Sequence, residues 1–167
     1  MPERIKVGMA SWKVARSRDI LVTFGLGSCV GLGLWDPETH IAAMAHIMLP
    51  DSKQPRFRQE LNPAKFADTA VKTMLDHFLQ TGIPFSRLQA KLVGGANMFA
   101  FPGRNGGTEG NISIGQRNVQ AVKDKLREFS IPVVGEDTGG SQGRSVEYYA
   151  DSGLMKIRTA LTGEREL

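Results

Sequence analysis

The sequence predicts an α+β fold in which mixed β-sheets are covered by helices. Short apolar runs bounded by turn residues outnumber the helical segments, as in the two runs that flank Asp36-Pro37-Glu38-Thr39. Two longer segments, near 62–82 and 113–129, carry apolar residues at helical spacing. Because hairpins are interspersed with two long helices, we expect the helices to form layers outside mixed and antiparallel sheets.

The length and composition are typical of a single globular domain over residues 1–167. Hydrophobic residues make up 41% and charged residues 23% of the chain, which is ordinary for a soluble protein. No apolar run approaches the roughly 20 residues that span a membrane, and the N-terminus lacks the apolar core of a signal peptide. We therefore expect a cytoplasmic protein that does not insert into a membrane.

Charge and metal-ligating residues narrow the classes of partner. The formal charge is +4, from 21 basic and 17 acidic residues that are dispersed along the chain. No helical segment presents a continuous basic stripe, so no nucleic acid partner is expected; the mild excess suits either solubility or an acidic protein partner. The single cysteine cannot form an internal disulfide, and the 3 histidines lack zinc-ligand spacing. No metal or other cofactor is expected.

The first part of the chain is predicted to form strands joined by turns. Segments 5–14 and 19–24 are expected strands, and the second ends at the loop Gly25-Leu26-Gly27-Ser28. Two further strands flank the turn at 36–39. Prolines and charges over 51–63 then indicate a surface loop.

The remaining elements alternate between helix and strand. Asn62 is the candidate N-cap of the first helix, with Pro63 at its first position and Gly82 at its end. The second helix is predicted to begin near Ser113. The other expected elements are strands at 85–93 and 131–136, a mobile glycine-rich segment at 94–110, a closing hairpin of 144–150 and 154–160, and a frayed tail at 162–167.

The hairpin around Asp36 offers a way to place a nucleophile beside a base. If Trp35 faces His40 across the turn, Cys29 faces His46 directly. Opposed residues of an antiparallel pair have Cβ atoms roughly 4.5–5.5 Å apart, which lets an imidazole pair with a thiol. A slip of one residue would put the two side chains on opposite faces. A lone cysteine is also commonly a buried hydrophobe and a lone histidine a satisfied core residue, so the spacing leaves both interpretations open.

The loop before the cysteine suits acyl chemistry. Gly25 and Gly27 let the chain turn sharply, so that backbone N–H groups around Gly27 and Ser28 can face the sulfur and stabilise an oxyanion. A phosphate-binding loop is the competing interpretation. It fails because Val30 stands where a dinucleotide-binding loop needs glycine, and the Gly-Lys-Ser/Thr ending of a P-loop is absent.

Short motifs along nearly the whole chain carry a resemblance to a known family. They are GLGSCV at 25–30, AHIMLP at 45–50, FADTAV at 66–71, GGANMF at 94–99, IGQRN at 114–118 and EDTGG at 136–140, with Arg144-Ser145 following. In this order they resemble the CheD family, the chemoreceptor glutamine deamidases of bacterial and archaeal chemotaxis. The stretch 101–110 is longer than the family usually carries.

The resemblance implies a site and a reaction. Cys29 would be the nucleophile, His46 its base, and Thr23 the third catalytic member, whose hydroxyl or carbonyl orients the imidazole. Without the family, Thr23 is more simply an ordinary β-branched strand residue. The family also implies the α-β-β-α layered fold of cysteine deamidases. Its reaction converts glutamines of methyl-accepting chemoreceptors to glutamate, with hydrolysis of glutamyl methyl esters as a secondary activity.

Two other functions remain open from the sequence. The family implies binding to a CheC-type phosphatase of the response regulator, so the chain could be a regulatory docking module with catalysis secondary. A redox-sensing thiol at Cys29 is a third interpretation, although the chain offers no second cysteine to act as a resolving thiol. Ammonia release that depends on Cys29 distinguishes the enzyme from the docking module.

Overall fold

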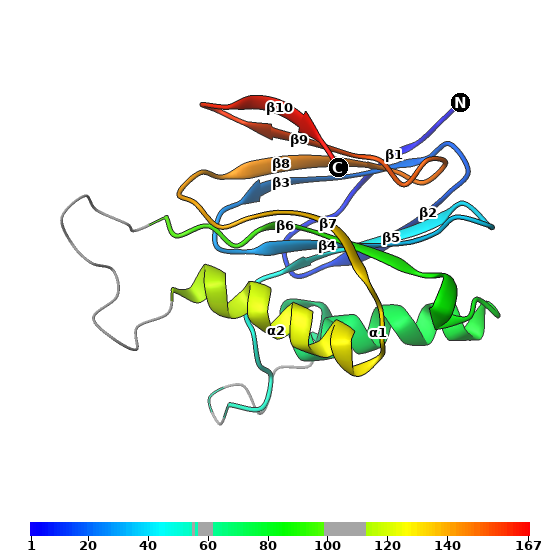
Figure 1. Cartoon of the computed structure of the whole chain (residues 1–167), viewed down its shortest axis with the longest axis horizontal. Helices are drawn as coiled ribbons and strands as arrows, with labels where there is room; N and C mark the ends of the chain where they lie inside the picture. Colours follow the sequence, from blue (N-terminus) through cyan, green and yellow to red (C-terminus); the bar gives the residue numbers. More distant parts are fainter. Residues whose placement is uncertain (55, 57–61, 99–112) are drawn as a thin grey trace.

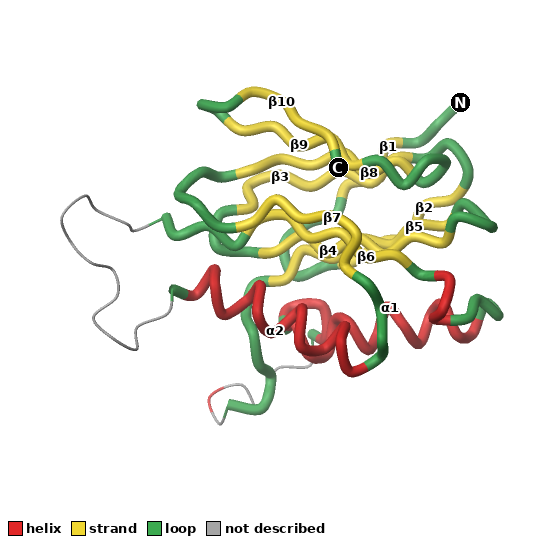
Figure 2. The backbone as a smooth tube through the Cα atoms, in the orientation of Figure 1, coloured by secondary structure: helices red, strands yellow, loops and turns green. Residues whose placement is uncertain are grey.

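The fold is built on two stacked five-stranded sheets (Figures 1 and 2). The computed structural model describes residues 1–54, 56, 62–98 and 113–167. One sheet, called here the β3 sheet, has the order β1 (Arg4–Lys6), β3 (Ile20–Leu26), β8 (Arg144–Tyr149), β9 (Met155–Thr159), β10 (Gly163–Glu166). The other, called the β4 sheet, has the order β2 (Trp12–Arg16), β5 (Ile41–Ile47), β4 (Val30–Asp36), β6 (Gln89–Gly94), β7 (Val133–Thr138).

Both long helices cover the same face of the β4 sheet (Figure 1). Helix α1 spans Ala67–Gln80 and α2 spans Ile114–Glu128, and they pack on each other and on strands of that sheet. The predicted class, α+β with mixed sheets and two long helices, is confirmed. The layers, however, run α-β-β in the described ranges instead of the expected α-β-β-α. The outer face of the β3 sheet carries polar side chains such as Glu147, Lys156 and Arg158, so it can face water.

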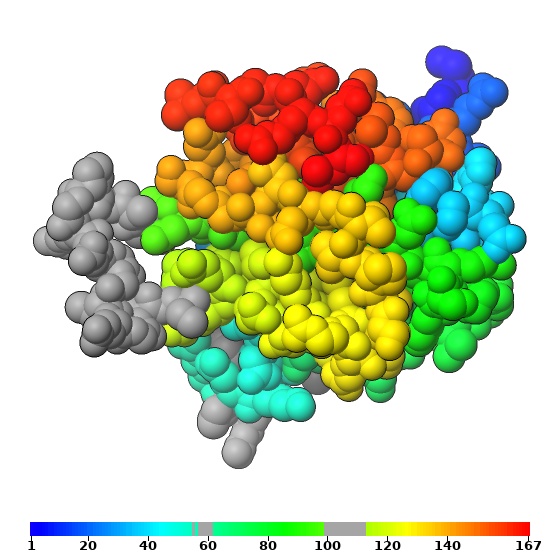
Figure 3. Space-filling model, viewed as in Figure 1, coloured from blue at the N-terminus to red at the C-terminus, as the bar shows by residue number. Residues whose placement is uncertain are grey.

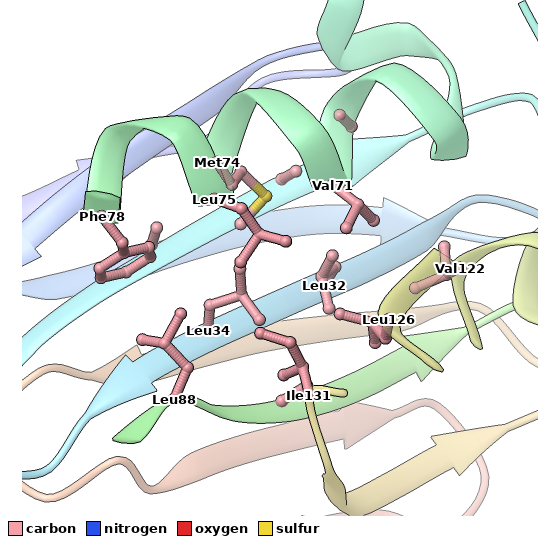
Figure 4. Close-up of a cluster of buried hydrophobic side chains, with 14 of the residues drawn as sticks. Leu32, Leu34, Val71, Met74, Leu75, Phe78, Leu88, Val122, Leu126 and Ile131 are labelled. Carbon is pink, nitrogen blue, oxygen red and sulfur yellow. The ribbon is translucent and has the colours of Figure 1, made fainter. Parts of the chain in front are cut away.

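Side chains of the β4 sheet alternate between two separate cores. On one side, alternate residues of β4 and β5 pack against the two helices (Figure 4). These residues are Val30, Leu32, Leu34, Ile41, Ala43, Ala45 and Ile47. On the other side, Gly33 faces the β3 sheet, where an added Cβ would lie 2.6 Å from the ring of Tyr148. Glycine therefore lets the two sheets approach closely along β4.

Of the two residues predicted to mark the starts of the long helices, Ser113 caps α2, whereas Asn62 caps a different element. The Ser113 side chain accepts a hydrogen bond from the Gln116 N–H at 3.2 Å, and the Gln116 side chain accepts one from the Ser113 N–H. The predicted start of the second helix is thus confirmed. Asn62 instead caps a short 3₁₀ turn, η2 (Pro63–Lys65), and α1 begins directly after Phe66. Among the described residues, no helix has the length and apolar character needed to cross a membrane.

Four other predicted segments can be compared with the structure. The expected strand at 5–14 is split into β1 and β2, which pair in different sheets, and Ala10, with a φ of 55°, lies in the turn between them. The strand expected at 85–93 begins as a 3₁₀ turn, η3 (Phe85–Arg87). The tail is paired instead of frayed: β10 adds to β9 and completes the layer farthest from the helices (Figure 3). Residues 99–112 of the glycine-rich segment lie outside the described part of the chain.

The hairpin of β4 and β5 has a register two residues away from the predicted one. Gly31, and not Cys29, pairs with His46. The predicted register was wrong because Asp36 belongs to the strand and not to the turn. Its carboxylate accepts a hydrogen bond from the Thr39 hydroxyl at 2.6 Å, which closes the turn one residue later along the chain. A shift of two residues keeps every side chain on its predicted face.

Candidate active site

The candidate site lies where the chain crosses from the β3 sheet to the β4 sheet. Residues 27–29 connect β3 to β4 at the end of the molecule where β6 also ends and α2 begins (Figure 1). The crossing turns sharply: Gly25 has a φ of 67°, and the Gly27 N–H donates to the Gly25 carbonyl at 3.0 Å. Cys29 follows, partly exposed and packed against the core between the sheets.

Two buried polar side chains meet between the sheets beside this crossing. Thr23 belongs to β3 and His46 to β5, and they are 0% and 1% exposed. Thr23 Oγ1 lies 2.8 Å from His46 Nδ1. The same hydroxyl lies 2.8 Å from the carbonyl oxygen of Val7. The structure therefore brings Thr23, which only the family resemblance had singled out, into contact with the histidine.

The hydrogen bonds of Thr23 determine which nitrogen of His46 carries the proton. A hydroxyl has one proton and a carbonyl can only accept, so Thr23 donates to Val7 and accepts from the Nδ1–H of His46. In the neutral imidazole the other nitrogen, Nε2, is then unprotonated. Nε2 is buried and has no hydrogen-bond partner among the described residues. His46 is thus arranged to accept a proton at Nε2.

Cys29 and His46 belong to the same layer of the molecule, although they are not directly opposed. His46 alternates along β5 with Ala45 and Ile47, which pack toward the helices, so its side chain lies between the sheets. Cys29 lies in the crossing, two residues before Gly31, the partner of His46. The structure puts Thr23 in contact with His46, and Cys29 packs against the core between the same two sheets.

Burial favours the neutral forms of both the thiol and the imidazole. Burial raises the pKa of the Cys29 thiol above its ordinary value of 9.0, while the residue's own backbone N–H acts in the opposite direction. Burial lowers the pKa of His46 below its ordinary value of 6.5. Both shifts favour a neutral thiol and imidazole over a thiolate and imidazolium.

Backbone hydrogen bonds hold the crossing from the β6 side. The N–H groups of Gly95 and Ala96 donate to the carbonyls of Cys29 and Gly27, both at 2.8 Å. Gly94 has a φ of 110°, and an added Cβ there would lie 2.3 Å from the Cys29 carbonyl oxygen. A side chain at this position would thus clash with the backbone of the loop that carries Cys29. Gly94, the last residue of β6, and the two residues after it therefore hold the loop that carries the sulfur.

The two residues predicted to stabilise an oxyanion differ in their hydrogen bonds. The Gly27 N–H is donated to Gly25 and is not available to a substrate. The Ser28 N–H has no hydrogen-bond partner among the described residues. Backbone N–H groups without a protein partner can stabilise a developing negative charge. Of the two, Ser28 retains a donor for this role.

Two buried side chains that support the region were predicted only as parts of the family motifs, without a role. Asn118 of α2 is 0% exposed, and its Nδ2 donates to the carbonyls of Ser28 at 2.9 Å and Met48 at 3.0 Å. Arg144, at the start of β8, is buried against Asp137, with Nη2 and Oδ1 3.3 Å apart. An asparagine on the buried stripe of an amphipathic helix is a signal that could have identified Asn118. The Arg144 contact depends on the tertiary fold and has no local signal.

Exposed apolar side chains border the crossing. Phe24, next to Thr23, is 53% exposed, and Met98 is 49% exposed. Met98 lies over Gly27, whose added Cβ would be 3.1 Å from the Met98 Cγ. Exposed apolar groups of this kind are suited to contact with another protein.

Comparisons with known proteins cover nearly the whole chain. The family model described as CheD chemotactic sensory transduction matches residues 48–159. The chain is 47% identical over 163 residues to the chemoreceptor glutamine deamidase CheD of Bacillus subtilis (strain 168), covering 98% of this chain and 95% of that protein. It is 47% identical over 167 residues to the protein of the same name from Halalkalibacterium halodurans, with 100% of both chains covered. The chain belongs to the CheD family.

Proposed function

We propose that this chain is a protein-glutamine deamidase that acts on the cytoplasmic region of methyl-accepting chemoreceptors. Relatives that align over nearly its full length carry the name chemoreceptor glutamine deamidase. The observation that carries the proposal is the unprotonated, unpartnered Nε2 of His46 in the same layer as the Cys29 thiol. A thiol next to such a base is suited to attack a carboxamide carbon. A substrate in the cytoplasmic region of the receptor would require a cytoplasmic enzyme, which is the location we propose.

In the first half-reaction, the Cys29 sulfur attacks the carboxamide carbon of a glutamine side chain. As the S–C bond forms, His46 Nε2 takes the thiol proton, and Thr23 keeps the ring oriented by accepting from Nδ1–H. The carbonyl oxygen becomes an oxyanion, which we assign to the N–H of Ser28. His46 then gives the proton to the nitrogen, the C–N bond breaks, and ammonia leaves. A γ-glutamyl thioester remains on Cys29.

In the second half-reaction, water hydrolyses the thioester. His46 Nε2 takes a proton from the water as its oxygen attacks the carbonyl carbon, and the C–S bond then breaks. The proton returns to the sulfur, and the side chain leaves as glutamate. A glutamyl methyl ester can enter at the same first step, with methanol leaving in place of ammonia. Slow methylesterase activity is therefore a secondary expectation.

A regulatory role as a docking partner of a CheC-type phosphatase is the alternative that the family resemblance implies. Such binding does not require the Cys29 thiol, whereas deamidation does. If Cys29→Ala still copurifies with the phosphatase but no longer releases ammonia, the two roles use separate surfaces. Copurification with no ammonia release from the wild type would favour the docking role.

Intact-mass spectrometry of a receptor cytoplasmic fragment tests the proposed function. The fragment is incubated with wild-type protein or with Cys29→Ala, whose fold is checked by circular dichroism. Wild type should add about 1 Da for each amide converted to an acid, and peptide mapping should place each change at a glutamine. The same mass gain with Cys29→Ala, or no gain with wild type on an intact and bound fragment, would contradict the proposal.

A further inference from the structure

Asn118 joins the two segments that carry the proposed nucleophile and its base. Its Nδ2 donates to the carbonyl of Ser28, the residue before Cys29, at 2.9 Å, and to the carbonyl of Met48, two residues after His46, at 3.0 Å. Both protons of the amide are thereby used. One side chain thus donates hydrogen bonds to both segments at once.

The end of a β-ladder explains why a side chain is needed at this point. The pairing of β4 with β5 ends at Val30 and Ile47. Beyond this pair the strands separate, because the Met48 N–H donates to the carbonyl of Lys65 at 3.0 Å and not to the neighbouring strand. The Asn118 amide takes the place of the missing ladder bonds and satisfies a carbonyl on each side.

The helix that carries Asn118 is itself fixed against the nucleophile loop. At Gly115 an added Cβ would lie 2.4 Å from the Ala96 carbonyl oxygen and 2.5 Å from that of Gly95. The first turn of α2 therefore lies directly on the turn whose N–H groups donate to the carbonyls of Cys29 and Gly27. The Asn118 side chain thus connects helix α2, which is packed closely on the turn after β6, to the crossing at residues 27–29.

The chemistry of the side chain points to these two bonds as its purpose. Asn118 Oδ1 is buried without a hydrogen-bond partner among the described residues. An unpartnered buried acceptor destabilises a fold, and a residue that served packing alone would carry no such atom. What the asparagine supplies is a pair of N–H donors, one directed to each of the two segments.

We propose that Asn118 is a positioning residue that sets the separation between Cys29 Sγ and His46 Nε2. The inference rests on the proposed function, because it concerns the transfer of a proton between these two atoms. Without the amide, the carbonyls of Ser28 and Met48 lose their shared donor and the two segments can move apart. A displacement of about 1 Å at reacting groups can slow a reaction about 100-fold. Asn118 is 0% exposed, so we expect no contact with the substrate and an effect of its loss on the chemical step.

Asn118→Ala tests the proposal, with Val122→Ala as the matched control. Both changes truncate an α2 side chain that is 0% exposed, but Val122 packs in the core between helix and sheet. Both variants should have a lower Tm. Only Asn118→Ala should lower kcat, by about 10- to 100-fold, with KM within about twofold of wild type. It should also slow iodoacetamide alkylation of Cys29 at neutral pH.

A second variant keeps the test decisive if Asn118→Ala does not fold. Asn118→Ser retains a hydroxyl donor at the same position and should lie between wild type and Asn118→Ala in kcat. If the folded Asn118 variant has the same kcat and the same alkylation rate as Val122→Ala, the positioning role is overturned. Failure of the proposed function is a separate result: wild type then releases no ammonia, or Cys29→Ala releases as much. In that case the positioning role of Asn118 is tested by the alkylation rate of Cys29 alone.

Discussion

The hydroxyl of Thr23 lies 2.8 Å from His46 Nδ1 and donates its proton to the Val7 carbonyl, also at 2.8 Å. The contact joins the two sheets, since Thr23 belongs to β3 and His46 to β5. A neutral hydroxyl thus orients the imidazole, as a carboxylate does in other triads. The hydroxyl adds no negative charge beside the ring that would raise the pKa of His46, so burial lowers that pKa without opposition from this neighbour.

Thr23→Val should reduce turnover while leaving the packing of β3 nearly unchanged. Valine has a similar shape but cannot accept a hydrogen bond from Nδ1–H, so the ring loses the contact that selects its tautomer. We expect kcat to fall by about 10- to 100-fold with a small effect on KM. Steady-state ammonia release with a receptor fragment measures both constants.

Thr23→Ser is the control for this change. Serine keeps the hydroxyl that accepts from Nδ1–H and donates to Val7, so its kcat should stay close to that of the wild type. A Thr23→Val variant as active as Thr23→Ser would show that the hydroxyl is not needed in the reaction.

Alkylation of Cys29 by iodoacetamide should be slow at neutral pH and should accelerate as the pH rises toward and beyond 9.0. Burial raises the pKa of this thiol above 9.0, and the thiolate is the form that reacts. His46→Ala should slow alkylation further at neutral pH, because the proton acceptor is lost. Mass spectrometry of timed samples gives the rates. Fast alkylation that does not change with pH through neutrality would instead indicate a preformed thiolate and imidazolium.

Acidification should destabilise the fold just below pH 6.5. Burial lowers the pKa of His46 below 6.5, so in this window the unfolded chain binds a proton that the folded protein does not. The free energy of unfolding should therefore decrease as the pH falls from 6.5 toward the folded-state pKa, by at most about 1.4 kcal/mol per pH unit for this group.

Urea unfolding at a series of pH values measures this slope. His46→Gln cannot titrate and should have a shallower slope than the wild type. His77, whose pKa is lowered by burial and by Arg16, should leave a residual slope in both proteins. Equal slopes in the two proteins would rule out His46 as a source of the pH dependence.

Gly94→Ala should impair both stability and turnover. The residue has a φ of 110°, and its new Cβ would lie 2.3 Å from the Cys29 carbonyl oxygen, so the nucleophile loop must move. Gly82→Ala is the control, since Gly82 has a φ of 80° but no atom within 4 Å of the added Cβ. The control should lose roughly 1–2 kcal/mol of stability from backbone strain alone, with normal kcat. Equal kcat in the two variants would contradict the role of Gly94 in holding Cys29.

The sequence predicted those features of the fold that depend on local periodicity and capping. The spacing of apolar residues identified both helices, and Ser113 marked the start of the second. Alternation along the predicted hairpin put Cys29 and His46 on one face. This prediction did not depend on the exact register, because the register was wrong by two residues, an even number. That error arose because Asp36 is held in the strand by Arg87, which lies 51 positions away in sequence, at 2.7 Å.

The parts of the site that could not be predicted depend on tertiary contacts. The carbonyl of Val7 reaches Thr23 only because β1 pairs with β3, and nothing near either residue in sequence indicates this. Asn118 lies 90 positions from Ser28, its hydrogen-bond partner. The layer order also differed, because hydrophobic periodicity indicates that a helix has a buried face without indicating which sheet it covers.

Trapping of the acyl intermediate tests the central claim, that Cys29 forms a glutamyl thioester, most directly. A receptor fragment is incubated with the protein in the presence of hydroxylamine, which attacks a thioester in competition with water. Peptide mass spectrometry should find a hydroxamate at the same glutamines that become glutamate, with wild type and not with Cys29→Ala. Glutamate formation at those positions with no hydroxamate at any hydroxylamine concentration would contradict a covalent intermediate on Cys29.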